Sequence, residues 1–96
     1  MAYDPGAIDA TLAAAVGDEP ALIAELRIAF VESAEKTIGA IESAKDDSAW
    51  VLATARLKGL AASFGAVRLM TLATEASATP HDDEVVRKLR RAVARL

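Results

Sequence analysis

Apolar and polar residues recur along the chain with the period of helices. The clearest example follows Asp18-Glu19-Pro20, where apolar and small side chains repeat at three-, four- and seven-residue spacings. This spacing is typical of a helix with one buried face. The expected buried stripe consists of Leu22, Leu26, Ala29, Phe30, Ser33, Thr37, Ala40, Ile41 and Ala44. The residues expected to face solvent are Glu25, Arg27, Glu32, Glu35 and Lys36.

Start and stop signals on either side of this long helix predict two neighbours. Asp4-Pro5 places an N-cap residue before a proline, which begins a short helix over Ile8–Val16 that stops at Gly17. Lys45-Asp46-Asp47-Ser48 interrupts the apolar pattern and caps the next helix, which runs to about Phe64. Gly65 then supplies a turn.

Two further helices complete the chain. One begins at Ala66 and ends before Thr79-Pro80, because the residue that precedes a proline disfavours helical geometry. Its apolar residues are Val67, Leu69, Met70 and Ala73. The last begins near Asp82-Asp83-Glu84 and becomes basic toward its end, which suits the helix dipole. Its apolar stripe is Val86, Leu89, Val93 and Leu96, and its basic residues are Arg87, Lys88, Arg90, Arg91 and Arg95.

These elements predict an all-α fold in a single domain over residues 1–96. Short connections make consecutive helices antiparallel neighbours, so we expect an up-down four-helix bundle with a short extra N-terminal helix. The composition agrees, because 53% of the residues are hydrophobic and much of that fraction is alanine, which favours helix. With 96 residues, the core is modest and must pack efficiently.

Composition and charge exclude several classes of function. The net charge of −3 argues against general nucleic-acid binding, which usually requires a large basic excess. The absence of cysteine and the presence of one histidine exclude disulfides and a conventional zinc site, so we expect no metal and no cofactor. Apolar runs are too short to cross a membrane, and Asp4 and Asp9 do not suit a signal peptide. We expect a cytoplasmic protein.

The helix that begins after Asp46 separates into two faces when each residue is placed at about 100° per step. The face expected to be buried contains Trp50, Ala53, Thr54, Leu57, Leu60, Ala61 and Phe64. The face expected to be exposed contains Val51, Leu52, Ala55, Lys58, Gly59 and Ala62. Glycine inside a helix costs about 1 kcal/mol relative to alanine, so an exposed Gly59 suggests close approach by a partner. The other interpretation is that Gly59 has no functional role and is merely tolerated. The apolar residues beside Gly59 favour an interface.

The same helix carries a motif over Ala53–Ala66, with Leu57-Lys58-Gly59 followed by small residues and Gly65-Ala66. It resembles the phosphoacceptor helix of the histidine-containing phosphotransfer (Hpt) domains of bacterial phosphorelays, which read His-x-Leu-Lys-Gly. The residue at the histidine position is Ala55. Gly17-Asp18 and Phe30 also fit the family, and the resemblance extends from about Asp4 to Ser77.

The resemblance implies that this chain takes part in phosphotransfer but has no active site of its own. Hpt domains pass a phosphoryl group between the aspartates of receiver domains, and the receiver supplies Mg²⁺ and the catalytic residues. It also implies that Lys58 supports phosphate and that Gly59 gives clearance, while Ala55 cannot accept a phosphoryl group. The expected partner is the receiver domain of a response regulator or hybrid histidine kinase, bound by a monomer. His81, the only histidine, is expected to be a solvated loop or cap residue rather than a substitute acceptor.

Several alternatives stay open at this level. Ala55 is either natural, in a docking competitor or scaffold, or the product of an engineered change at the acceptor position. A helical interaction or dimerisation module unrelated to phosphotransfer is the second hypothesis, with the basic last helix as its binding surface, although such runs are commonly solvated. An enzyme is the least supported class, because no nucleophile–base pair or glycine-rich phosphate loop is present. Thr54 and Ser63 are expected to bond to the helix backbone.

Overall fold

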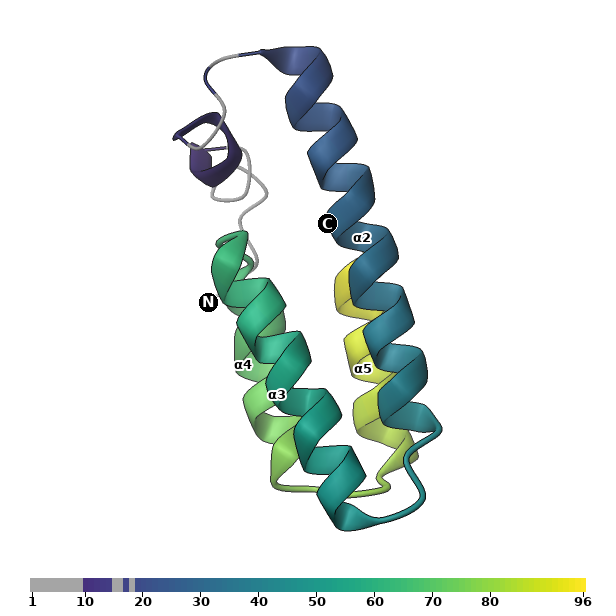
Figure 1. Cartoon of the computed structure of the whole chain (residues 1–96). Helices are drawn as coiled ribbons and strands as arrows, with labels where there is room; N and C mark the ends of the chain where they lie inside the picture. Colours follow the sequence, from purple (N-terminus) through teal and green to yellow (C-terminus); the bar gives the residue numbers. More distant parts are fainter. Residues whose placement is uncertain (1–9, 15–16, 18) are drawn as a thin grey trace.

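The computed structural model describes residues 10–14, 17 and 19–96 of the chain. All regular secondary structure in this part is helical, which confirms the all-α prediction (Figure 1). A helical segment over residues 10–14 precedes α2 (Pro20–Glu42), α3 (Asp47–Ser63), α4 (Val67–Ser77) and α5 (Asp83–Ala94). Among the described helices, none has the length and apolar character needed to cross a membrane.

The predicted helix starts are confirmed for three helices. Pro20 occupies the first turn of α2, where its missing N–H removes no helical hydrogen bond. At α3, the Asp46 carboxylate accepts a 2.7 Å hydrogen bond from the Ala49 N–H. At α5, the Asp82 carboxylate accepts a 2.9 Å hydrogen bond from the Glu84 N–H. Each bond satisfies a donor that the first helical turn leaves without a partner.

Gly65 ends α3 as expected, and Gly17 also has a positive φ. Gly65 adopts φ +70 and its N–H donates to the Ala62 carbonyl, while the Ala66 N–H donates to the Ala61 carbonyl at 2.9 Å. This pair of bonds is a Schellman motif, whose left-handed residue glycine adopts without steric cost. Gly17 has φ +82 and donates to the Ala13 carbonyl at 2.8 Å. The predicted start at Asp4-Pro5 and the limits of the helix over Ile8–Val16 lie outside the described residues.

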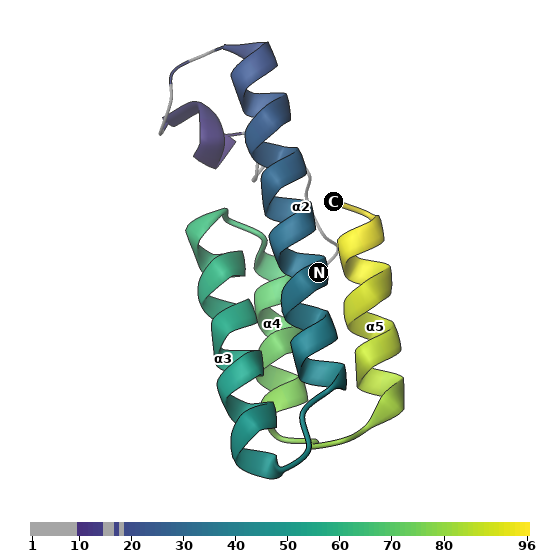
Figure 2. The ribbon, with the colours of Figure 1, turned by 45° about the vertical axis from the view of Figure 1, so that its right-hand side comes forward.

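The helices contact one another in a closed ring. α3 packs against α2 and α4, and α5 packs against α4 and α2, whereas the main chains of the diagonal pairs of these four helices lie farther apart. Figures 1 and 2 show the long α2 extending past the ends of its neighbours, with the segment over residues 10–14 beside its upper part. Leu12 from that segment is buried. The core therefore lies inside the ring and is extended by one apolar side chain from the N-terminal region.

Large side chains from every helix meet in this core. The rings of Phe30 in α2 and Phe64 at the end of α3 stack with centroids 4.6 Å apart. The Trp50 Nε1–H donates a 2.6 Å hydrogen bond to the Ala76 carbonyl of α4, so the one buried indole has its polar atom satisfied. The buried residues of α5 are Val85, Val86, Leu89 and Val93, and Leu96 is half-buried. The predicted stripe of this helix is correct and is widened by Val85.

The predicted stripe of α2 was partly wrong. Phe30 and Ile41 are buried as expected, but the other fully buried residues are Ala34 and Ile38, which the prediction omitted. Four residues assigned to the stripe are exposed, namely Leu22, Ala29, Ser33 and Ala40, and three are half-buried, namely Leu26, Thr37 and Ala44. Arg27, which we expected in solvent, is half-buried. Alanine occurs on both faces of this helix, so the sequence pattern has too little contrast to fix its rotation.

Candidate functional site

The two faces of α3 are those that the sequence predicts. Its buried residues are Trp50, Ala53, Thr54, Leu57 and Ala61, and Leu60 and Phe64 are half-buried. The exposed residues named from the sequence form a surface that we call the outer face of α3, consisting of Val51, Leu52, Ala55, Lys58, Gly59 and Ala62. Because α2 and α4 both pack on the opposite side of α3, no other described helix covers this face.

Ala55, Lys58 and Gly59 lie next to one another on this surface. In a helix, residues three and four positions apart are neighbours one turn away, so Lys58 and the bare backbone of Gly59 both adjoin Ala55. Apart from its chain neighbours and the backbone of its own helix, a Cβ built on Gly59 would have no atom within 4 Å. The centre of the outer face of α3 is therefore open, with no side chain larger than a methyl at Ala55 or Gly59.

The cations on α3 have no carboxylate partners among the described residues. Neither Lys58 nor its neighbour Arg56 forms an ion pair or side-chain hydrogen bond within the described part of the chain, and both are exposed. From residue 48 to residue 63 the helix contains no Asp or Glu. The chain as a whole carries a net charge of −3, so this helix presents a locally positive surface on an acidic protein.

Two large apolar side chains border the same surface. Val51 is 44% exposed and Leu52 is 56% exposed. They lie in the first two turns of α3, ahead of Ala55. Exposed aliphatic residues beside small residues and unpaired cations give the outer face of α3 the mixture of apolar and charged groups found at many protein interfaces.

The hydroxyl groups of α3 bond to its own backbone, as predicted. Thr54 Oγ1 donates to the Val51 carbonyl at 2.9 Å, and Ser63 Oγ donates to the Gly59 carbonyl at 3.0 Å. Thr54 is completely buried. Within the described residues neither hydroxyl is hydrogen-bonded to a base, so the geometry does not favour either oxygen as a nucleophile.

His81 is an exposed residue in the α4–α5 connection, and it has contacts that sequence reasoning missed. Its Nε2 lies 2.9 Å from Oδ1 of Asp47, and its ring lies 5.4 Å from that of Trp50. Because a carboxylate only accepts hydrogen bonds, Nε2 is the donor. His81 also has φ +64, an unusual value for a residue with a side chain. It therefore links the α4–α5 connection to the start of α3 and lies away from Lys58 and Gly59.

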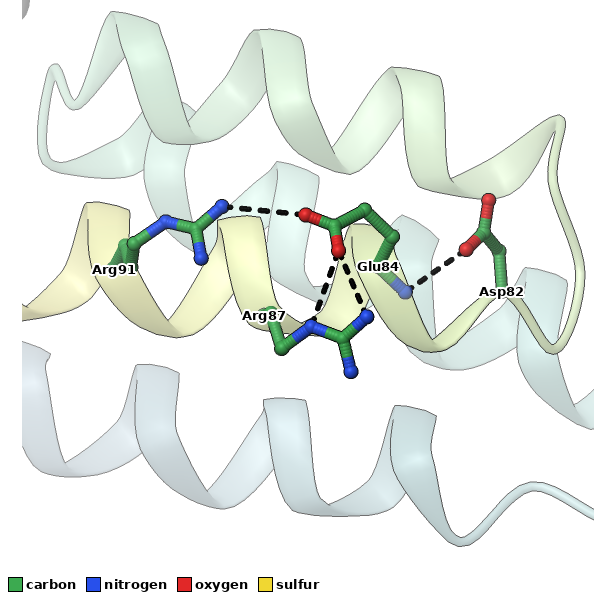
Figure 3. A network of polar contacts seen from close by, with 4 residues as sticks. All are labelled: Asp82, Glu84, Arg87 and Arg91. Carbon is green, nitrogen blue, oxygen red and sulfur yellow. Dashed lines mark hydrogen bonds and ion pairs between the residues drawn. The ribbon is translucent and has the colours of Figure 1, made fainter.

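The basic residues of α5 are mostly engaged with acidic residues of the same protein. Arg87 donates two hydrogen bonds to Glu84 Oε2, at 2.7 and 3.1 Å, and Arg91 lies 3.5 Å from Oε1 (Figure 3). Hydrogen bonding from Arg87, followed by its charge, lowers the pKa of Glu84. Arg90 donates to Glu42 of α2 at 2.7 Å. All five basic residues are exposed, as expected for a solvated face, and three of them are paired with carboxylates of the same protein.

Comparison of the chain with protein-family models, curated proteins and solved structures found no match. Among the described residues, no group of three or more His, Cys, Asp or Glu side chains could hold a metal ion. The outer face of α3 is thus the surface on which the sequence motif and the geometry coincide.

Proposed function

We propose that this chain is an Hpt-like module of a bacterial phosphorelay that docks receiver domains and cannot itself carry phosphate. The observation that carries the proposal is the exposure of Ala55, Lys58 and Gly59 together on α3, directly opposite its buried side. The family resemblance requires solvent access at these three positions. A buried Lys58 or a covered Gly59 would have excluded docking there.

We also propose that the four long helices form an antiparallel up-down bundle, as in Hpt domains. The ring of helix contacts supports this arrangement, as do the connections of a few residues between consecutive helices. The alternation of chain direction from α2 to α5 that can be followed in Figures 1 and 2 supports it as well. Such a bundle holds α3 rigid along its length, so that a partner meets a preformed surface.

Each residue of the site has a distinct role in the proposal. Lys58 provides a positive charge for phosphoryl oxygens, since a charge-assisted hydrogen bond is stronger than a neutral one. Gly59 leaves the backbone open for close approach, and Val51 and Leu52 supply apolar contact. Ala55 has no nucleophilic atom, so no phosphoryl group is transferred to it. The receiver would contribute Mg²⁺ and catalytic residues, and this chain would act in the cytoplasm as a monomer and not as an enzyme.

The alternative hypothesis is a helical interaction module that binds an acidic partner through the basic face of α5. The contacts of that face support it less well. The basic face of α5 has Arg87, Arg90 and Arg91 already engaged with Glu84 and Glu42. An acidic partner would have to compete with these internal pairs. By contrast, Lys58 and Arg56 on α3 form no such pairs within the part of the chain that the structure describes.

Binding of receiver domains to matched glycine variants tests the proposal. Gly59 and Gly39 are both inside helices, and a Cβ at either position meets nothing within 4 Å beyond its chain neighbours and its own helix backbone. Gly59→Gln adds a bulky neutral side chain to the outer face of α3, whereas Gly39→Gln adds the same side chain to α2. We expect Gly59→Gln to abolish receiver binding and Gly39→Gln to retain it. Binding that is equal for both variants would overturn the proposal.

A further inference from the structure

We infer that α2 carries a second binding surface, which takes a basic amphipathic helix of a partner protein. We call this surface the N-terminal flank of α2, and it consists of Ala24, Glu25, Ile28, Val31, Glu32 and Glu35. When each residue is placed at about 100° per step, these six share an arc of about 120°, and Arg27 and Lys36 lie beyond its two edges. The flank is on a different helix from the outer face of α3, so the inference is independent of receiver docking.

The first argument is continuity with the contact between α2 and α5. Near its C-terminal end, α2 pairs with α5 through Glu42, whose Oε1 accepts a 2.7 Å hydrogen bond from Arg90. Glu35 and Ile28 precede Glu42 by seven and fourteen residues, so they continue the same side of α2. The α5 helix ends at Ala94, and Figures 1 and 2 show α2 extending past it. The N-terminal flank therefore continues a surface that already binds an arginine-bearing helix, and α5 leaves this part of it uncovered.

The second argument is the exposed apolar centre of the flank. Ile28 is 58% exposed in the middle of a long helix. Ala24 and Val31 lie on the same side, one turn before and one turn after it, and Val31 is half-buried. The carboxylates of Glu25 and Glu32 border these apolar side chains. An apolar centre with a charged border is the arrangement in which an apolar side chain of a partner is shielded from water.

The third argument is charge complementarity. Glu25, Glu32 and Glu35 are exposed and form no ion pair with any described residue, whereas Glu42 and Glu84 are paired with arginines. A cationic helix therefore meets acceptors that have no competing partner. The same carboxylates repel anionic lipid and nucleic acid. The cations of α3 and α5 repel a basic helix and so direct it to α2.

The test measures binding of the whole chain to a designed helical peptide of about 20 residues, with leucine on one face and lysine on the other. A matched peptide has glutamate in place of lysine. We expect the lysine peptide to bind, more weakly as salt is added, and the glutamate peptide not to bind. Circular dichroism of each variant of the chain confirms that it is folded.

Two pairs of variants locate the binding surface. Glu32→Lys should weaken binding of the lysine peptide about tenfold, because a repulsion replaces an attraction. Glu75→Lys makes the same change in charge at an exposed residue of α4, the helix diagonal to α2, and should leave binding nearly unchanged. Ile28→Ala should also weaken binding about tenfold, because it removes the apolar centre. Val67→Ala, at a residue that is 62% exposed on α4, is its control.

The possible results decide the inference. Weaker binding in Glu32→Lys and Ile28→Ala, with binding retained in Glu75→Lys and Val67→Ala, supports it. Equal losses in Glu32→Lys and Glu75→Lys would show attraction to net charge alone and would overturn it. A folded chain that does not bind the lysine peptide, or that binds the glutamate peptide equally well, overturns it too. Self-association in sedimentation that Glu32→Lys abolishes would assign the flank to a second copy of the chain and overturn the inference of a partner helix.

Discussion

The indole Nε1 of Trp50 donates a 2.6 Å hydrogen bond to the main-chain carbonyl oxygen of Ala76 in the protein interior. Trp50 lies in the first turn of α3, and Ala76 lies in the last turn of α4. The bond therefore joins the two helices at one end and fixes the rotation of α3 about its axis. That rotation determines that Ala55, Lys58 and Gly59 face solvent.

Substitution of Trp50 by Phe should lower the free energy of unfolding by about 2 kcal/mol, because it removes the buried hydrogen bond and leaves a smaller ring. The Ala76 carbonyl keeps a second donor, the Thr79 N–H at 3.1 Å, so it is not left without a partner. Urea unfolding followed by circular dichroism measures the change. Ordinary surface substitutions change the free energy of unfolding by less than about 0.5 kcal/mol. A decrease within that range would show that the Trp50–Ala76 hydrogen bond contributes little to stability.

His81 offers a test of backbone conformation, because its φ is +64. His81→Ala and His81→Gly both lose the contacts with Asp47 and Trp50, but only glycine adopts this φ without a clash of its Cβ. We expect the glycine variant to be more stable than the alanine variant by about 1 kcal/mol. Thermal or chemical unfolding of the pair gives this difference directly. Equal stability would show that the position relaxes to another conformation.

The contacts of His81 also show where sequence reasoning ends. Asp47 and His81 are 34 positions apart, and their meeting depends on how the α4–α5 connection turns, which no local pattern encodes. The two faces of α3 could be predicted, because Trp50 and Leu57 share one side and Lys58 and Gly59 share the other. In α2, alanines on both faces hid the burial of Ala34 and Ile38. The buried face of a helix can be predicted where its two faces differ clearly in polarity, and helix propensity does not supply this information.

Glu84 should make stability depend on pH in a defined direction. Arg87 lowers its pKa in the folded protein, so its contribution is present above the pKa of the unfolded chain and is lost as the pH falls through the lowered value. Glu84→Gln should therefore reduce stability at neutral pH and make no difference in strong acid. Denaturant midpoints at several pH values measure this effect.

Glu32→Gln is the control for Glu84, because Glu32 is exposed on α2 and forms no ion pair among the described residues. It makes the same change in net charge. A difference between wild type and Glu84→Gln that stays constant down to strong acid, or that is matched by Glu32→Gln, would contradict the role assigned to Arg87.

Gly59 should lower the stability of α3, although it keeps the outer face of this helix open to a partner. Gly59→Ala places a methyl in open space in the middle of a helix, so we expect unfolding to become less favourable by about 1 kcal/mol. Gly39→Ala should stabilise α2 by a similar amount. Both values come from thermal unfolding. A destabilised Gly59→Ala variant would mean that this glycine is required by the fold rather than available to a partner.

The candidate site itself was predictable in position because its residues lie on one helix, where spacing alone sets which of them are neighbours. Exposure of Val51, Leu52, Ala55, Lys58, Gly59 and Ala62 follows from the burial of the opposite side. That Lys58 forms no ion pair with any described residue was not predictable, because ion pairing depends on where the other helices place their carboxylates. That freedom is what makes the surface suited to a negatively charged partner.

The most direct measurement of the central claim is phosphoryl transfer from labelled receiver domains of the same genome to the Ala55→His variant. The imidazole restores a nucleophile beside Lys58 and Gly59 on a surface that is otherwise unchanged. We predict that Ala55→His takes up label, that the unmodified chain does not, and that Ala55→His combined with Gly59→Gln loses the uptake. Failure of a folded Ala55→His variant to accept label from any receiver would contradict the assignment of the outer face of α3 as a receiver-docking surface.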